Sequence, residues 1–108
     1  MTGAVFYRRD GRLTGFKVSG HTDDSGSVEA RIVCSAVSSA VYLTANTLTD
    51  VVGAEAEIQV SDGDFSLFVK GDDPRTQDLL KGLRLHLSQL AEQYHNYIVI
   101  KTEVQHDA

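Results

Sequence analysis

The chain is poor in cysteine, proline and tryptophan. It holds one cysteine, Cys34, one proline, Pro74, and no tryptophan among 108 residues. A single cysteine excludes an internal disulfide, so the fold does not need an oxidising compartment. One cysteine and four scattered histidines lack the paired spacing of a structural zinc site, and no phosphate-binding glycine loop is visible. The sequence therefore predicts neither a metal nor another cofactor.

Positive charge and long apolar runs are also scarce. Ten Lys and Arg stand against fifteen Asp and Glu, which gives a formal net charge of −5. Because proteins hold nucleic acid largely through cationic contacts to phosphate, this balance argues against nucleic acid as the main ligand and favours a basic peptide or protein. We find no apolar stretch that approaches the roughly 20 residues of a membrane span, so we expect a cytoplasmic protein without a membrane partner.

The remaining composition is that of one globular α+β domain. Hydrophobic residues make up 42% and charged residues 23%, as in folded chains. The pattern predicts the order strand, strand, helix, strand, strand, helix, strand. Because hairpins pair antiparallel strands, we expect a single domain over residues 1–108, with a mixed β-sheet and two helices packed on one face.

Two hairpins are predicted from turn dipeptides that lie between β-rich segments. Asp10-Gly11 and Asp62-Gly63 suit the positive φ angles of two-residue turns. The segments around them alternate apolar and polar residues or are rich in β-branched and aromatic ones, which favours strands. The expected strands cover residues 4–8, 12–19, 54–60, 65–69 and 97–104.

Apolar side chains at three- and four-residue spacing predict two helices. The first is expected from about residue 32 to 51, after a polar loop over 20–30. The second follows an N-cap at Asp73, takes Pro74 as its first helical residue and ends near His95. The expected buried stripes are Val33, Val37, Ala40, Val41, Thr44, Leu48 and Val51 in the first helix and Leu79, Leu80, Leu83, Leu87, Leu90 and Tyr94 in the second.

Cys34 has two interpretations that the residues alone leave open. Free cysteine is commonly buried and behaves as a small hydrophobe, which favours a structural role. Placement in the first helical turn would instead expose the thiol to the positive end of the helix dipole and favour the thiolate, and the glycine-bearing loop before it would give access. Two non-proteolytic alternatives are a binding module without catalysis and a redox sensor that forms a sulfenic acid.

His21 is the best-placed partner if the thiol of Cys34 is a nucleophile. Imidazole is the usual base for a catalytic thiol, and it need not be close in sequence. Asp23 and Asp24 would orient His21 as a third catalytic member, although solvated loop acids are the interpretation that we favour. The other histidines lie on the second predicted helix, at its end and in the tail: His86, His95 and His106.

The segments "SGHT" and "IVCSAVS" resemble the ribosomal-processing cysteine protease family Prp. In that family a strand ends in Gly-His, and a later helix opens with Val-Cys and continues through small residues to a serine. The resemblance covers nearly the whole chain, because the order of strands and helices matches too. It implies that Cys34 is the nucleophile and His21 the general base of a dyad. It also implies that Gly20 precedes the base and that Ser38 shapes or polarises the site.

The resemblance further implies a substrate and an assembly. Family members remove a short N-terminal extension from large-subunit ribosomal protein twenty-seven, cut after an aromatic pair and are homodimers. We therefore expect a peptide substrate and backbone amides at the start of the first helix as oxyanion donors. The acids Asp23, Asp24 and Glu29 would attract a basic segment after the cut.

The sequence departs from the family pattern in the segment between His21 and Cys34. Arg31 stands where the family usually has an Asp, three residues before the cysteine. The loop is one residue longer than is common, and "TDDSGSVEA" lacks the aromatic residue often found near its start. These differences concern the substrate contacts of the loop and the N-cap of the first helix, while both members of the dyad are in place.

Overall fold

A five-stranded sheet and two long helices make up most of the chain. The computed structural model describes residues 1–20 and 27–106. Its elements, in chain order, are β1 (Thr2–Arg9), β2 (Arg12–Gly20), α1 (Val28–Asn46), the short π-helix η1 (Thr47–Val51), β3 (Ala56–Ser61), β4 (Asp64–Val69), α2 (Pro74–Gln93) and β5 (Ile98–Val104).

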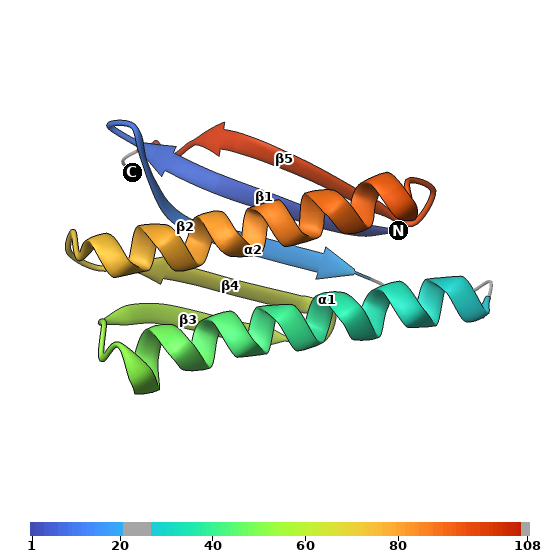
Figure 1. The fold of residues 1–108 in the computed structure, drawn as a ribbon, viewed down its shortest axis with the longest axis horizontal. Coiled ribbons are helices and arrows are strands. Elements are labelled where there is room, and N and C mark those ends of the chain that lie inside the picture. The colour runs from blue at the N-terminus through green and yellow to red at the C-terminus, as the bar shows by residue number, and fades with distance from the viewer. Residues whose placement is uncertain (21–26, 107–108) are drawn as a thin grey trace.

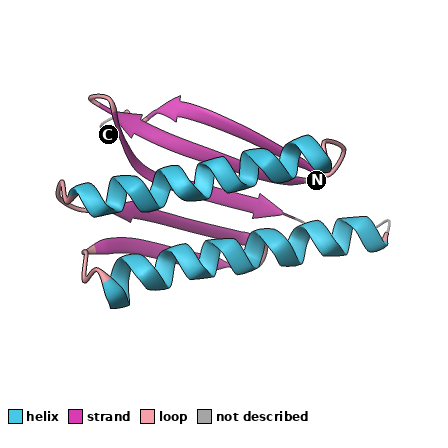
Figure 2. Ribbon diagram, in the orientation of Figure 1, coloured by secondary structure: helices cyan, strands magenta, loops and turns pink. Residues whose placement is uncertain are grey.

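The sheet is mixed, with the strand order β3-β4-β2-β1-β5. β1 pairs antiparallel with β2 and parallel with β5, so the last strand returns beside the first. Both helices lie across the same face of the sheet (Figure 1), and short loops join β1 to β2, β3 to β4, β4 to α2 and α2 to β5 (Figure 2). The predicted class is thereby confirmed: a single α+β domain with two helices on one face.

Both predicted hairpin turns are present. Asp10 and Gly11 have φ angles of 54° and 77°, the left-handed conformation that a tight turn of this kind requires. In the second turn only Gly63 is left-handed, with φ of 79°. Ser61 pairs directly with Asp64 on either side of this second turn, which fixes the register of β3 against β4.

The first helix begins four residues earlier than expected. The Ser27 side chain accepts a hydrogen bond from the Ala30 amide at 3.1 Å, so the helix starts at Val28 rather than near Ile32. Of the loop expected over 20–30, Gly20 is the last residue of β2 and residues 28–30 are helical, while residues 21–26 lie outside the described residues. Apolar periodicity could not show this, because the first helical turn is partly exposed and a polar cap, not a buried stripe, sets the start.

The inner stripe of α1 forms the centre of the core. Val33, Val37, Val41, Thr44 and Leu48 are buried, as predicted. The prediction that Val51 is buried is wrong, because its side chain is 78% exposed. The chain passes from α-helix into η1 at Thr47, and the wider π-helical turn changes which residues face the sheet.

The segment Val28–Val51 is apolar over much of its length. It is 24 residues long and contains an 18-residue window with a mean hydropathy of 1.3, so by length and composition it would suffice to cross a membrane. The expectation that no stretch approaches such a span was therefore wrong. In this fold its inner side chains cover the sheet, as in the core helix of a globular domain.

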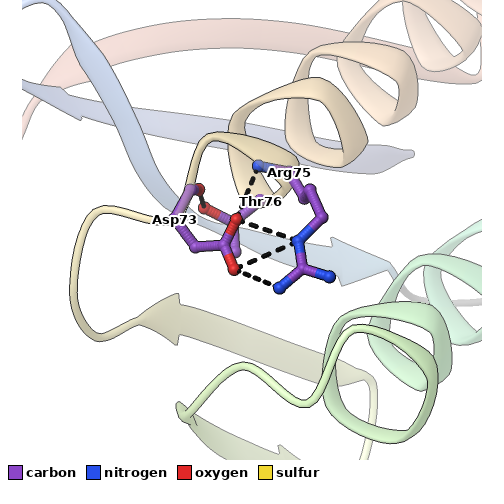
Figure 3. Close-up of polar contacts among 3 residues, drawn as sticks. All are labelled: Asp73, Arg75 and Thr76. Carbon is purple, nitrogen blue, oxygen red and sulfur yellow. Dashed lines mark hydrogen bonds and ion pairs between the residues drawn. The ribbon is translucent and has the colours of Figure 1, made fainter.

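The start of α2 follows the prediction closely. The Asp73 carboxylate accepts a hydrogen bond from the Arg75 amide at 2.9 Å, and Pro74 is the first helical residue. The Arg75 guanidinium also binds this carboxylate at 2.7 Å (Figure 3), and these hydrogen bonds lower the pKa of Asp73. Since the folded-state pKa is lowered, this cap stabilises the fold at neutral pH and loses its effect as the pH falls through that pKa.

Gly15 marks the closest approach between strands. A Cβ atom at this position would clash with the Leu67 carbonyl oxygen and would lie 2.9 Å from the Cα of Phe68. On the face that the helices leave uncovered, the rings of Tyr7 and Phe68 pack at a centroid distance of 5.4 Å across this glycine. The absence of a side chain therefore allows β2 and β4 to pair.

We expect Gly15→Ala to lower the free energy of unfolding by about 3 kcal/mol, because the added methyl group meets backbone that cannot move away. Gly82→Ala is the matched control. Gly82 lies within α2 with no atom within 4 Å of the added Cβ, so this change should raise stability by up to about 1 kcal/mol. Urea unfolding of both variants measures the difference, and equal stabilities would contradict the packing described for Gly15.

Candidate active site

A cavity of about 190 Å³ lies between α1 and the end of the sheet where β2 finishes and β3 turns into β4. Cys34 and Ser38 line it from the helix, while Thr2 and Gly20 line it from β1 and β2. Three of the residues predicted for the site, Cys34, Ser38 and Gly20, therefore meet at one cavity. The other lining residues are Val18, Val37, Val41, Tyr42, Val60, Ser61, Gly63, Asp64 and Phe65.

Aromatic rings form one wall of the cavity. Phe65 stacks on the fully buried Phe16 at a centroid distance of 6.0 Å, and Tyr42 meets Phe65 edge to face at 5.5 Å. Because Phe16 also packs against Phe6 in the core, the wall is rigidly supported from behind. Sequence reasoning missed Tyr42 and Phe65 as site residues, since nothing in their local pattern distinguishes them from core or surface positions.

Cys34 is half-buried and sits in the second turn of α1, not the first. The helix starts at Val28, so Cys34 is its seventh residue and lies roughly 9 Å along the axis from the start. The field of a helix terminus falls off within the first turn. The prediction that Cys34 lies in the first helical turn is therefore wrong, and the helix dipole gives its thiolate less support than expected. The oxyanion donors stay a prediction.

The Ser38 hydroxyl makes no hydrogen bond to any described residue. Hydroxyls within helices often bond back to the carbonyl four residues earlier, as Thr44 does to Ala40 at 2.8 Å and Thr47 to Leu43 at 2.7 Å. Ser38 instead lines the cavity one turn beyond Cys34. Since helical side chains lean toward the N-terminus, its hydroxyl is free to bind a ligand near the sulfur.

Gly20 and Thr2 close the cavity at the sheet. A Cβ on Gly20 would lie 3.0 Å from the Thr2 hydroxyl oxygen, so a larger residue would push Thr2 aside. Thr2 is only 7% exposed, and its hydroxyl has no hydrogen-bond partner among residues 1–20 and 27–106. Sequence reasoning did not single out Thr2, because a threonine in a strand is common and its position opposite Gly20 depends on strand pairing.

The predicted base and its acidic neighbours lie outside the described residues. These are His21, Asp23 and Asp24. Gly20, which is covalently bonded to His21, lines the cavity, and Ser27 on the far side of the segment caps α1. Arg31, which stands where the family usually has an aspartate, does not prevent capping of α1. Ser27 caps the helix instead, and the Arg31 amide donates a hydrogen bond to the Ser27 carbonyl.

The remaining histidines are exposed and do not line this cavity. They lie on α2, in the turn that follows it and near the C-terminus: His86, His95 and His106. Among the described residues no three His, Cys, Asp or Glu side chains gather as a metal ligand set would. The chemistry that the described cavity offers is that of a thiol, free hydroxyls and an apolar wall.

Solved structures with the same fold come from two bacteria. SMU.848 of Streptococcus mutans is 27% identical with a TM-score of 0.84, and the match covers 97% of this chain and 96% of that one. An essential ribosomal processing protease Prp of Staphylococcus aureus, bound to a substrate peptide, is 20% identical with a TM-score of 0.86 and coverage of 94% and 99%. The same S. aureus protease with a covalently linked product peptide is 22% identical with a TM-score of 0.84. No curated protein sequence matches the chain.

The family assignment follows from the sequence together with this fold. The one cysteine of this small α+β domain lies at a cavity, where its thiol is only half-buried. The family model for cysteine protease Prp matches residues 1–99. The chain therefore belongs to the cysteine protease Prp family, as the "SGHT" and "IVCSAVS" segments predicted.

We expect Ser38→Ala to lower kcat/KM for peptide cleavage about tenfold, because the variant loses a hydroxyl that is free to bind the reacting group. Stability should stay within about 0.5 kcal/mol of wild type, since no hydrogen bond within the protein is lost. Ser39→Ala, one position round the helix and away from this cavity, is the control. Steady-state kinetics and urea unfolding provide the two readouts, and equal kcat/KM for all three proteins would exclude this role for Ser38.

Proposed function

We propose that this protein removes the N-terminal extension of large-subunit ribosomal protein twenty-seven through a Cys34–His21 dyad. The position of Cys34 at a cavity with an aromatic wall, together with membership of the Prp family, carries this proposal. The S. aureus protein of the same fold is described as a ribosomal processing protease, and its covalently linked product peptide is what nucleophilic catalysis would leave. Gly20 at the cavity supports His21 as the base, because the two residues are adjacent in sequence.

The first chemical step forms an acyl-enzyme. The Cys34 thiolate attacks the carbonyl carbon of the scissile bond and forms a carbon–sulfur bond. The imidazolium of His21, which holds the thiol proton, then gives that proton to the leaving amine as the carbon–nitrogen bond breaks. The product of this step is a thioester on Cys34 and a free new N-terminus.

Hydrolysis of the thioester completes the cycle. His21 takes a proton from water, the hydroxide attacks the thioester carbonyl, and the sulfur leaves and recovers the proton. The negative oxygen formed in both steps needs hydrogen-bond donors. Besides the backbone amides near the start of α1, we assign one donor to the Ser38 hydroxyl, which lines the cavity one helical turn beyond the thiol.

An aromatic side chain before the cut would fit the wall of this cavity. Tyr42 and Phe65 present ring surfaces there, and aromatic rings prefer tilted or offset contacts with one another. The stack of Phe65 on Phe16 holds the wall in place, so little ordering is needed when the substrate binds. Asp64 also lines the cavity and adds to the acids Asp23 and Asp24 that would attract a basic segment of the substrate.

We also propose that the protein acts in the cytoplasm as a homodimer. The outer surface of α1 carries apolar side chains that the described chain leaves uncovered: Val28 is 65% exposed, Ile32 48% and Leu43 69%. Steps of four and eleven residues place all three on one side of the helix. Such a stripe favours burial against a second copy.

Cleavage of a peptide that spans the extension tests the proposed function. We expect wild type to cut the peptide once, after an aromatic pair, and Cys34→Ala to lose at least about 10³-fold in rate, because the chain has no other thiol. Mass spectrometry identifies the bond that is cut.

The matched control is His86→Ala, which removes an exposed histidine far from the cavity and should leave cleavage unchanged. If Cys34→Ala cut as fast as wild type, the protein would not use its thiol. If neither protein cut a peptide that binds, a non-catalytic binding module would replace the proposed function.

Sedimentation equilibrium tests the dimer. We expect wild type to be dimeric at micromolar concentration and Leu43→Lys to raise the dissociation constant at least about tenfold, because the change places a charge in the apolar contact. Val99→Lys, at an exposed apolar position on the sheet, is the control and should not alter the dimer. A monomeric wild type, or a dimer disrupted only by Val99→Lys, would contradict the assignment of this surface.

A further inference from the structure

β3 is an edge strand whose outer row of backbone groups makes no described contact. It pairs on one side with β4 and has no strand on the other. The pair Ser61–Asp64 closes a two-residue turn, so its members exchange backbone hydrogen bonds. The Lys70 amide bonds to the Glu55 carbonyl at 2.9 Å, so residue 55, like Ser61, directs its backbone groups toward the β4 side.

These two hydrogen-bonded positions show which backbone groups of β3 point away from β4. Hydrogen-bonded and non-hydrogen-bonded pairs alternate along an antiparallel ladder. Positions 55, 57, 59 and 61 therefore bond to β4, while the N–H and C=O groups of Ala56, Ile58 and Val60 point outward. None of the described hydrogen bonds uses these outward groups.

The edge leads directly into the proposed active site. Val60 and Ser61, at the end of β3, line the cavity that Cys34 lines. Figure 1 shows the β3–β4 hairpin running beneath α1. The outward groups of Val60 thus lie next to the cavity, with those of Ile58 and Ala56 following at intervals of about 6.6 Å along the strand.

The side chains of this edge suit an apolar partner on one face. Ile58 and Val60 project on the helix-covered side, where they pair with Leu67 and Phe65 of β4, yet they are 39% and 61% exposed. The backbone row and the apolar side chains are therefore both left open along the same strand. A protein that exposes such an edge normally protects it with charged residues, proline or a bulge. β3 has no proline or bulge, and its one charged residue, Glu57, projects on the opposite face from Ile58 and Val60.

The sheet has a second edge, β5, which does not reach the cavity. The Thr2 amide bonds to the Tyr97 carbonyl at 2.8 Å, and the Gln105 amide bonds to the Arg8 carbonyl, so odd-numbered positions of β5 face β1. Even-numbered positions such as Thr102 point outward. No residue of β5 lines the cavity that holds Cys34, which makes this edge an internal control.

We propose that the β3 edge binds the extended substrate peptide as an additional strand, so that Val60 and then Ile58 exchange backbone hydrogen bonds with residues on one side of the scissile bond. This inference rests on the proposed protease function and specifies how its substrate is held. Backbone pairing supplies affinity independent of sequence, while the side chains beside Ile58 and Val60 select apolar residues at every second substrate position.

Ile58→Pro tests the edge from the side of the enzyme. Proline removes the outward N–H of residue 58 without breaking a bond to β4, and edge strands tolerate proline at such positions. We expect kcat/KM for the extension peptide to fall about tenfold. Ile58→Val keeps the N–H and should stay near wild type, and Thr102→Pro makes the same backbone change on the opposite edge and should have no effect.

A series of N-methylated peptides tests the edge with the wild-type enzyme, so folding of a variant does not enter. Methylation of a single peptide nitrogen removes one donor and blocks one edge contact. If the peptide pairs with β3, an N-methyl group at every second residue on one side of the cut should lower kcat/KM about tenfold. An N-methyl group at the residues between them should have no effect. A loss confined to residues next to the cut, or equal at all positions, would overturn the proposal.

The outcomes separate this inference from the proposed function. Efficient cleavage by wild type with unchanged kcat/KM for Ile58→Pro would overturn the β3 edge as the binding site and leave the protease function standing. A wild-type protein that neither binds nor cuts the extension peptide would overturn the proposed function and, with it, this use of the edge. The proposal is established if kcat/KM falls at alternate N-methylated positions of the peptide and also falls in Ile58→Pro but not in Ile58→Val or Thr102→Pro.

Discussion

The burial of one stripe of α1 against the sheet determines the position of the reactive group. Val33, Val37 and Val41 are at most 2% exposed and fix the rotation of the helix about its axis. Successive residues of an α-helix are about 100° apart, so Cys34, next to Val33, must lie at the boundary of the buried stripe rather than within it. That boundary position leaves the thiol half-buried at the cavity, where it is shielded and still accessible.

The sheet supplies the opposite wall through strand pairing. Gly15 allows β2 and β4 to approach, and this pairing brings Phe65 over Phe16 and the β3–β4 turn beside Gly20. The Gly20 amide bonds to the Gly63 carbonyl at 2.9 Å, which ties the end of β2 to that turn. Helix rotation and strand pairing thus converge on one cavity, and the same hairpin that completes it presents a free strand edge.

Much of the fold could be predicted because local signals agreed with it. Asp10-Gly11 requires a left-handed turn, and Asp73 before Pro74 caps a helix, so both boundaries were confirmed. The start of α1 at Val28 was missed because a Ser27 cap, not a buried stripe, determines it. The site was predicted only in part: Cys34, Ser38 and Gly20 belong to short motifs, whereas Thr2, Tyr42 and Phe65 reach the cavity through pairing between elements far apart in sequence.

Detection of the acyl-enzyme tests most directly whether Cys34 is the nucleophile. Mixing the protein with its extension peptide and quenching with acid within the first turnover should trap a thioester, which intact mass spectrometry measures and peptide mapping locates. If Cys34 is the nucleophile, the added mass equals that of the fragment N-terminal to the cut and is carried by the peptide that contains Cys34. Cleavage without any covalent intermediate, or an adduct on another residue, would contradict the assignment of Cys34 as the nucleophile at this cavity.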